Sequence, residues 1–93
     1  MQCSSLQEIR ENIDRIDDEI IKLIAERGKY VVAASAFKKT ENDVKAPKRV
    51  DAVISKVRSK AIEYGADPNM LEKLYREMIE CFISMEMKQF DNQ

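Results

Sequence analysis

The fold is decided by residues 6–38, which read LQEIRENIDRIDDEIIKLIAERGKYVVAASAFK. The apolar residues at the start of this stretch step alternately by three and four positions, as Leu6, Ile9, Ile13, Ile16, Ile20 and Leu23. This spacing is typical of the heptad seam of one amphipathic helix. We expect the helix to begin near Ser5, with Glu8 completing a capping box, and to run to about Lys39. Such a rod, on the order of 50 Å long, needs partners along its whole apolar face.

An arginine interrupts this apolar face. The same steps lead from Leu23 to Arg27, so a guanidinium lies on the side of the helix that should be buried. Burying an unpaired charge is costly, and Arg27 must therefore meet an anion. Lys38 follows eleven residues later and returns to within roughly 20° of the same face. Two inward-facing cations predict a pocket for a small, multiply charged anion.

Composition excludes several classes of protein. The chain has 93 residues, two glycines, two prolines, no histidine and a net charge of −1, which favours one helical domain over residues 1–93. The two cysteines form no CxxC pair, so we expect no metal site and no Ser/His or Cys/His nucleophile. The charge balance gives no basic field for nucleic acid, and no apolar run suits a signal peptide or a membrane span. These features indicate a cytoplasmic protein.

The rest of the chain predicts two more helices. Residues 40–45 are polar and are expected to form a loop. A second helix should start around Pro47 and end at Gly65 as its C-terminal cap. Asp67 then caps a third helix that begins at Pro68 and continues to about residue 90.

Three further charged residues stand out by their positions. Arg49 lies in the first turn of the second helix, and Glu86 follows Tyr75, Ile79 and Phe82 on an inward stripe. Arg10 is 17 residues from Arg27, about 25 Å along one helix, so the two could share a small ligand only if two copies of the helix packed antiparallel. Snorkelling or salt-bridged surface side chains remain the alternative interpretation of these charges.

Two segments carry a resemblance to a known family. The stretch IRENIDRIDDEIIKLIAERGKYVVAASAFK resembles the first helix of the all-α chorismate mutase family (chorismate mutase type II), and the remainder to residue 90 resembles its second and third helices. The resemblance implies an intertwined homodimer of three-helix chains with two equivalent active sites shared between the chains. It also implies no metal and no organic cofactor. The segment Ala46-Pro47-Lys48-Arg49-Val50 resembles the isochorismate pyruvate lyase branch, which uses the same pocket to make salicylate and pyruvate.

The resemblance assigns roles to single residues. Arg10 matches the arginine lent by the partner chain, Arg27 the arginine that binds a substrate carboxylate, and Arg49 the arginine of the second helix. Lys38 matches the lysine that holds a carboxylate and the ether oxygen of the breaking bond. Two positions depart from the common pattern. Val50 replaces a Glu that accepts a hydrogen bond from the ring hydroxyl, and Glu86 replaces a Gln that donates to the ether oxygen.

The implied activity is that of a chorismate mutase, an isomerase that converts chorismate to prephenate in aromatic amino acid biosynthesis. This pericyclic rearrangement suits a chain without histidine, because placed cations and a compact substrate conformation can supply the catalysis. Lys38, Arg27 and a protonated Glu86 are the expected catalytic residues, with Arg10, Arg49 and Val50 completing the substrate site. Isochorismate pyruvate lyase is one alternative. A non-catalytic helical dimer or regulatory module is the other.

Overall fold

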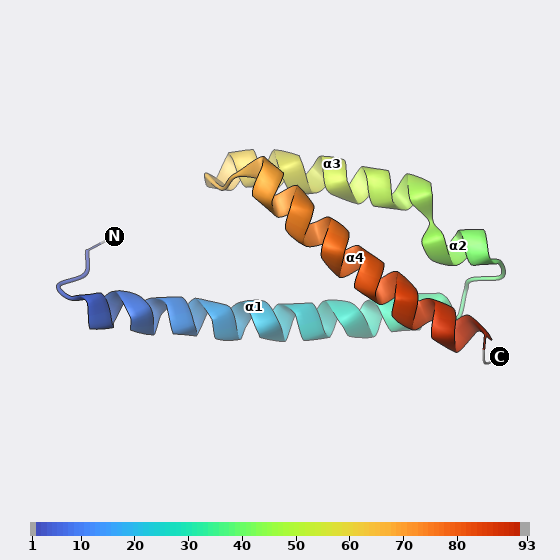
Figure 1. The fold of residues 1–93 in the computed structure, drawn as a ribbon, viewed down its shortest axis with the longest axis horizontal. Helices are drawn as coiled ribbons and strands as arrows, with labels where there is room; N and C mark the ends of the chain where they lie inside the picture. Colours follow the sequence, from blue (N-terminus) through green and yellow to red (C-terminus); the bar gives the residue numbers. More distant parts are fainter. Residues whose placement is uncertain (1, 92–93) are drawn as a thin grey trace. The chain divides into compact units, whose positions relative to one another are not determined.

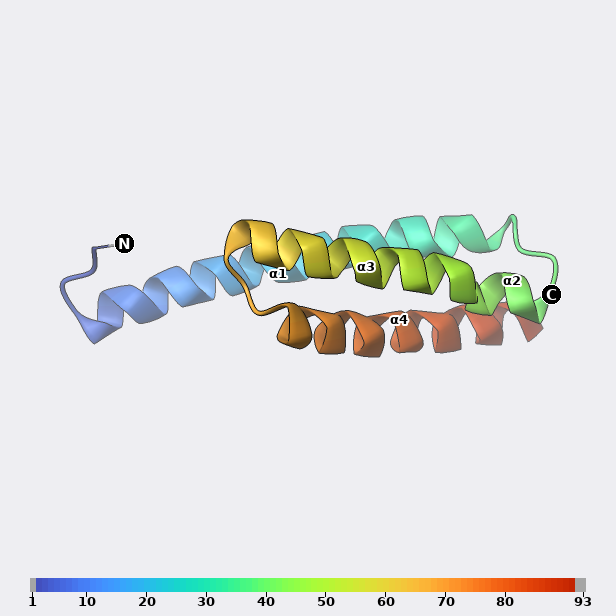
Figure 2. The same ribbon diagram turned by 90° about the horizontal axis from the view of Figure 1, so that it is seen from above.

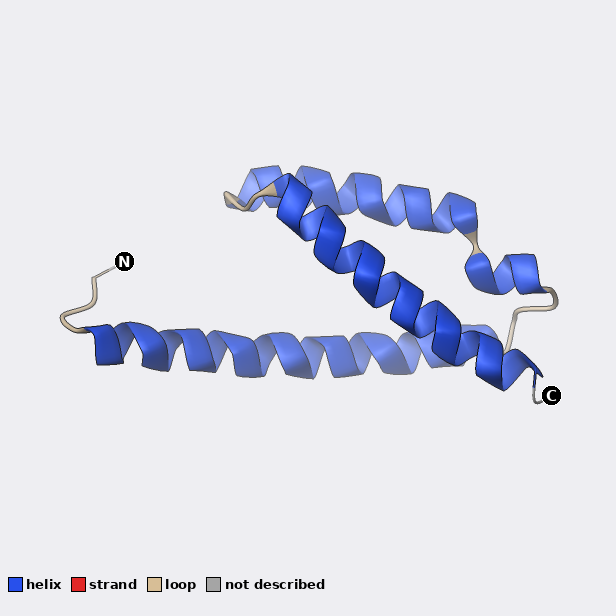
Figure 3. Ribbon diagram, viewed as in Figure 1, coloured by secondary structure: helices blue, strands red, loops and turns tan. Residues whose placement is uncertain are grey.

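The structure is a computed structural model that describes residues 2–91, and these residues form helices and no strands (Figures 1 and 3). The elements are α1 (Leu6–Ser35), α2 (Glu41–Lys45), α3 (Pro47–Tyr64) and α4 (Pro68–Asp91). The predicted all-α fold with three long helices is confirmed, and α2 is a short addition to it. None of these helices combines the length and the continuous apolar character needed to traverse a bilayer. Contacts divide the chain into two units, residues 1–33 and 34–93, so a single domain stays a prediction.

Helix α1 starts where its capping residues predict. The hydroxyl of Ser5 accepts a hydrogen bond from the Glu8 backbone N–H at 3.1 Å, as an N-cap does. The Glu8 carboxylate accepts from the backbone N–H and the hydroxyl of Ser4, at 3.0 and 2.8 Å, rather than from Ser5. These hydrogen bonds from Ser4 lower the pKa of Glu8, and the bond from the backbone N–H has the largest effect. The capping box is therefore displaced by one residue.

The apolar face of α1 is uncovered in the single chain. Ile13, Ile16 and Ile20 are each about half exposed, at 50%, 45% and 47%, and Leu23 is 64% exposed. The one buried residue of the helix is Gly28. An apolar stripe of this length on an amphipathic helix is a surface that another apolar surface normally covers.

The prediction of a loop over residues 40–45 is wrong, and so is the extension of the first helix to Lys39. Helix α1 ends at Ser35, and residues 41–45 form α2. The Thr40 hydroxyl accepts from the Asp43 N–H, and the Asp43 carboxylate accepts from the Thr40 N–H, which together make a capping box. The Asp43 carboxylate also accepts a hydrogen bond from the Lys39 N–H. Because these amides serve the start of α2, they cannot continue α1.

Helices α3 and α4 form an antiparallel hairpin, as Figure 2 shows. Gly65, at φ +78°, caps α3 in the left-handed conformation, and its N–H is directed at the carbonyls of Ala61 and Ile62. Asp67 accepts from the Asn69 N–H at 2.8 Å and so caps the start of α4. The predicted helix ends around this turn are confirmed.

The core of residues 34–93 is small. Its buried apolar residues are Val44 of α2 and Ile54 and Ala61 of α3, which are 2%, 5% and 4% exposed. Helix α4 packs against both α2 and α3. The buried polar residue among those described is Glu86 of α4, at 6% exposure. A carboxyl group thus occupies a position in this thin core that an apolar side chain would normally take.

Candidate active site

Lys38 and Glu86, which are far apart in the sequence, form an ion pair. The Lys38 Nζ lies 3.9 Å from the Glu86 Oε2, and the two side chains are only 22% and 7% exposed. The buried Oε2 accepts no hydrogen bond from any residue that the structure describes. The prediction that Glu86 points inward from α4 is confirmed. The pair is largely withdrawn from water, where either charge acts strongly on its neighbour.

The turn between α1 and α2 holds the Lys38 ammonium. The Lys38 N–H donates to the Ser35 carbonyl at 3.1 Å, and Nζ donates to the backbone carbonyl of Asp43 at 2.8 Å. The Asp43 carboxylate accepts from the N–H groups of Lys39 and Thr40, at 3.0 and 3.1 Å. These bonds, with Lys39 the largest cause, lower the pKa of Asp43. Asp43 therefore contacts the lysine through its carbonyl and the turn through its carboxylate.

Arg49 and Val50 lie in the first turn of α3. Ala46 precedes the helix in the left-handed conformation, at φ +41°, and Pro47 occupies the first helical position. The Val50 N–H donates to the Ala46 carbonyl at 3.0 Å. Val50 is half-buried, whereas Arg49 is exposed and forms no ion pair within residues 2–91. An exposed arginine of this kind is available to a carboxylate of a ligand.

Arg10 and Arg27 both lie on α1. Arg10 is exposed and makes no ion pair with a described residue, while Arg27 is half-buried next to the buried Gly28. Their separation on one continuous helix is about 25 Å, so the two guanidiniums of one chain cannot hold the same small ligand. The assignment of Arg10, Arg27, Lys38, Arg49, Val50 and Glu86 to one site stays a prediction.

Sequence reasoning missed the role of Asp43, although the pattern of Thr40 followed three residues later by Asp43 carries the signal of a capping box. This signal was hidden because the segment is short and polar. Sequence reasoning also missed a cluster of charged side chains near the turn between α3 and α4.

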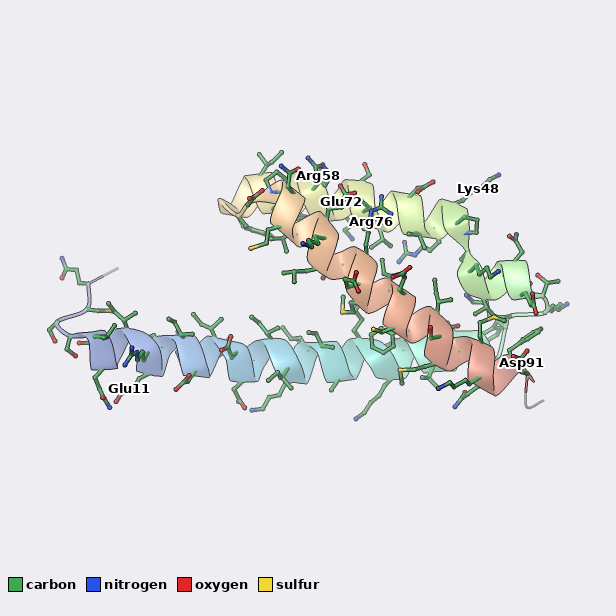
Figure 4. The ribbon with its side chains drawn as sticks, in the orientation of Figure 1. Glu11, Lys48, Arg58, Glu72, Arg76 and Asp91 are labelled. Atoms are coloured by element: carbon green, nitrogen blue, oxygen red, sulfur yellow. The ribbon has the colours of Figure 1, made fainter. Side chains whose placement is uncertain are left out.

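The charged cluster consists of Arg58, Glu72 and Arg76 (Figure 4). The Arg58 Nη1 donates to Glu72 Oε1 at 2.9 Å, and the Arg76 Nε donates to Glu72 Oε2 at 2.7 Å. The hydrogen bonds from the two arginines lower the pKa of Glu72, and the bond from Arg76 has the largest effect. An open cavity of about 400 Å³ adjoins the cluster. Because Arg58 of α3 and Arg76 of α4 both donate to the Glu72 carboxylate, the cluster joins α3 to α4.

The described part of the chain provides no set of side chains that could bind a metal ion. Among residues 2–91, no group of three or more His, Cys, Asp or Glu side chains is arranged to hold a metal ion. What residues 34–91 offer instead is a positioned ammonium beside a buried carboxyl group, with an exposed arginine, Arg49, on α3. Such groups can bind an anion and stabilise negative charge that develops on it.

Comparison with known proteins identifies the relatives of this chain. The sequence model of the family described as chorismate mutase type II matches residues 9–87. The chain is 40% identical over 86 residues to an isochorismate pyruvate lyase from Pseudomonas aeruginosa, covering 92% of this chain and 85% of that enzyme. It is 34% identical over 87 residues to a bifunctional chorismate mutase/prephenate dehydratase from Aquifex aeolicus, covering 89% of this chain and 24% of that protein. It is 33% identical over 76 residues to a chorismate mutase from Methanocaldococcus jannaschii, covering 81% and 77%.

Proposed function

Because the chain belongs to the chorismate mutase type II family, we propose that it is a chorismate mutase that rearranges chorismate to prephenate. The observation that carries the proposal is the Lys38–Glu86 pair, in which an ammonium lies 3.9 Å from a carboxyl group that is itself buried. In this role the enzyme would contribute to aromatic amino acid biosynthesis. A cytoplasmic location remains a prediction from the sequence.

The reaction places specific demands on these two side chains. The carbon–oxygen bond of the ether breaks as a carbon–carbon bond forms within the same molecule, so no nucleophile is needed. Negative charge grows on the ether oxygen in the transition state, and a fixed donor there lowers the barrier. The Lys38 ammonium is such a donor. Glu86 can be a second donor only if it carries a proton in the substrate complex, because the ionised carboxylate that pairs with Lys38 in the free protein would repel the growing charge.

The arginines would supply the other half of catalysis by binding the two substrate carboxylates. A guanidinium binds a carboxylate through two parallel hydrogen bonds, which fixes its orientation as well as its position. The exposure of Arg10 and Arg49, neither of which is ion-paired within residues 2–91, supports this role. Held at both carboxylates, the substrate would stay in the compact conformation that the rearrangement requires.

We propose that the active enzyme is a homodimer with shared active sites. The uncovered apolar face of α1, on which Ile13, Ile16 and Ile20 are about half exposed, supports a second copy as its partner. Arg10 and Arg27 of one chain are about 25 Å apart, so in this proposal they would serve different sites.

The dimer proposal is tested by mixing inactive variants. In a hybrid of Arg10→Ala and Arg27→Ala chains, one of the two sites keeps both arginines. Random exchange of subunits should therefore restore about a quarter of the wild-type activity. Each variant measured alone is the control. Verified exchange without any recovery would exclude a site shared between chains.

Isochorismate pyruvate lyase is the second candidate, and two observations favour it. The relative with that name is 40% identical over 92% of this chain. Val50 is half-buried at the start of α3, and a valine cannot accept the hydrogen bond that a glutamate would accept from the ring hydroxyl of chorismate. In the lyase reaction the same pocket would release pyruvate from isochorismate and leave salicylate.

Substrate turnover decides between the candidates. Purified protein is given chorismate and isochorismate separately, and prephenate, salicylate and pyruvate are measured. Prephenate from chorismate supports the mutase, and salicylate with pyruvate from isochorismate supports the lyase. Val50→Glu should raise the preference for chorismate, with Val53→Glu on α3 as the matched control. Turnover of neither substrate would refute both enzymatic functions and favour a non-catalytic helical module.

A further inference from the structure

Asp43 is the residue to which the turn after α1 is anchored. Its carboxylate Oδ2 accepts two backbone N–H groups, those of Lys39 and Thr40, at 3.0 and 3.1 Å. Its own N–H donates to the Thr40 hydroxyl at 3.1 Å. Three hydrogen bonds thus fix Asp43 against the two residues that directly follow Lys38.

The carbonyl of the same residue contacts the Lys38 ammonium. The Lys38 Nζ donates to the Asp43 carbonyl oxygen at 2.8 Å, and the same ammonium lies 3.9 Å from Glu86. A lysine side chain has four rotatable bonds and loses much conformational freedom when it is held in one place. The carbonyl supplies a fixed acceptor on one side, and the Glu86 carboxyl supplies an opposite charge on the other.

We propose that Asp43 is a positioning residue for the proposed reaction. The Asp43 carboxylate fixes the turn after α1, and this turn places the Asp43 carbonyl where it holds the Lys38 ammonium beside Glu86. This inference rests on the proposed function, since Lys38 is a catalytic residue only if that function is right. Small displacements of a catalytic group slow the reaction strongly, and a shift of about 1 Å can lower the rate roughly a hundredfold. A carboxylate that makes no contact with substrate would thereby control turnover.

The alternative is that Asp43 only stabilises α2 as an ordinary helix cap. A purely structural role would change the melting temperature of Asp43→Ala and leave the turnover of the folded protein intact. A positioning role changes kcat at temperatures where the variant is fully folded. Because Lys38 would act mainly on charge that develops in the transition state, kcat should fall much more than KM rises.

Three variants separate these roles. Asp43→Ala should lower kcat by roughly tenfold to a hundredfold. Asp43→Asn should retain most of the wild-type kcat, because the amide oxygen can still accept from both N–H groups. Glu41→Ala is the matched control, since Glu41 is also an exposed acid of α2 but its side chain makes no hydrogen bond or ion pair with a described residue. It should keep wild-type kcat.

A measurement independent of activity follows Lys38 itself. The rate at which an amine-reactive reagent labels Lys38 is measured by mass spectrometry on the intact folded protein. Release of the ammonium from the Asp43 carbonyl should make labelling several-fold faster in Asp43→Ala, and Asp43→Asn should match the wild type. If Asp43→Ala does not fold, Thr40→Val replaces it, because it removes one hydrogen bond of the cap and should show the same changes in smaller size.

The outcomes distinguish this inference from the proposed function. Slower turnover together with faster labelling in Asp43→Ala, both reversed in Asp43→Asn, supports the positioning role. Wild-type kcat in folded Asp43→Ala, or an equal loss in Glu41→Ala, overturns it. If the wild-type protein turns over neither chorismate nor isochorismate, the proposed function fails, and unchanged labelling in Asp43→Ala would separately overturn the hold on Lys38.

Discussion

The pair formed by Lys38 and Glu86 should make the stability effects of mutating these two residues strongly dependent on each other. Two unit charges 3.9 Å apart attract each other by about 4 kcal/mol at an effective dielectric constant of about 20. Lys38→Met removes the ammonium, keeps an unbranched side chain and leaves the Glu86 carboxylate buried without its counter-charge. Breaking a buried pair in this way costs about 3–5 kcal/mol.

Lys38→Met should lower the free energy of unfolding much less when the residue at position 86 carries no charge. In the Glu86→Gln background, Lys38→Met loses mainly the hydrogen bond to the Asp43 carbonyl, worth about 1 kcal/mol. The difference predicts a coupling energy of about 2–4 kcal/mol between the two positions.

Urea unfolding followed by circular dichroism measures all four members of this double-mutant cycle. The protomer concentration must be the same throughout, because a dimer's stability depends on it. The cycle is run at pH 7. If the two single changes simply add at pH 7, to within about 0.5 kcal/mol, then the pair does not interact as the 3.9 Å distance requires.

Three further predictions concern single residues. Glu86→Gln should retain turnover at pH 7, because the amide N–H can donate a hydrogen bond to the ether oxygen whereas an ionised carboxylate cannot; a large loss of kcat would contradict a donor role at this position. The lowered pKa of Glu72 means that its stabilising contribution is present above the unfolded pKa and is lost as the pH falls through the folded value. When the free energy of unfolding of each protein is expressed relative to its value at neutral pH, the wild type should therefore begin to lose stability at a higher pH than Glu72→Gln. Ala46→Gly should raise the free energy of unfolding by up to about 1 kcal/mol, because glycine adopts the left-handed conformation without the cost that alanine carries; a lower stability than wild type would show that the backbone there is not strained.

Most of the helical plan could be predicted from local signals. Pro47, Gly65 and Pro68 mark helix ends through backbone properties that do not depend on the rest of the chain, and the structure confirms all three positions. The stripe on α4 likewise predicted that Glu86 would be buried. These features are legible because each follows from a few neighbouring residues.

What could not be predicted depends on competition and on distant contacts. Helix α2 has five residues, too few for a hydrophobic period, and only its capping box marks it. Ala46 adopts a left-handed conformation that its residue type disfavours, so no composition rule would have found it. The distance between Lys38 and Glu86 follows from the packing of α2 on α4, which spacing along the sequence does not specify. The partner of the α1 face is likewise a property of an assembly.

The single junction residue between α2 and α3 has a consequence for how the gene can change. Ala46 both ends α2 and precedes α3, so residues 41–49 contain one residue, Ala46, outside a helix. An insertion within α3 before Arg49 would turn Arg49 and every later residue of the helix by about 100° relative to its first residue. A one-residue insertion in the first turn of α3 should therefore disturb the position of Arg49 more than a substitution at a neighbouring residue does.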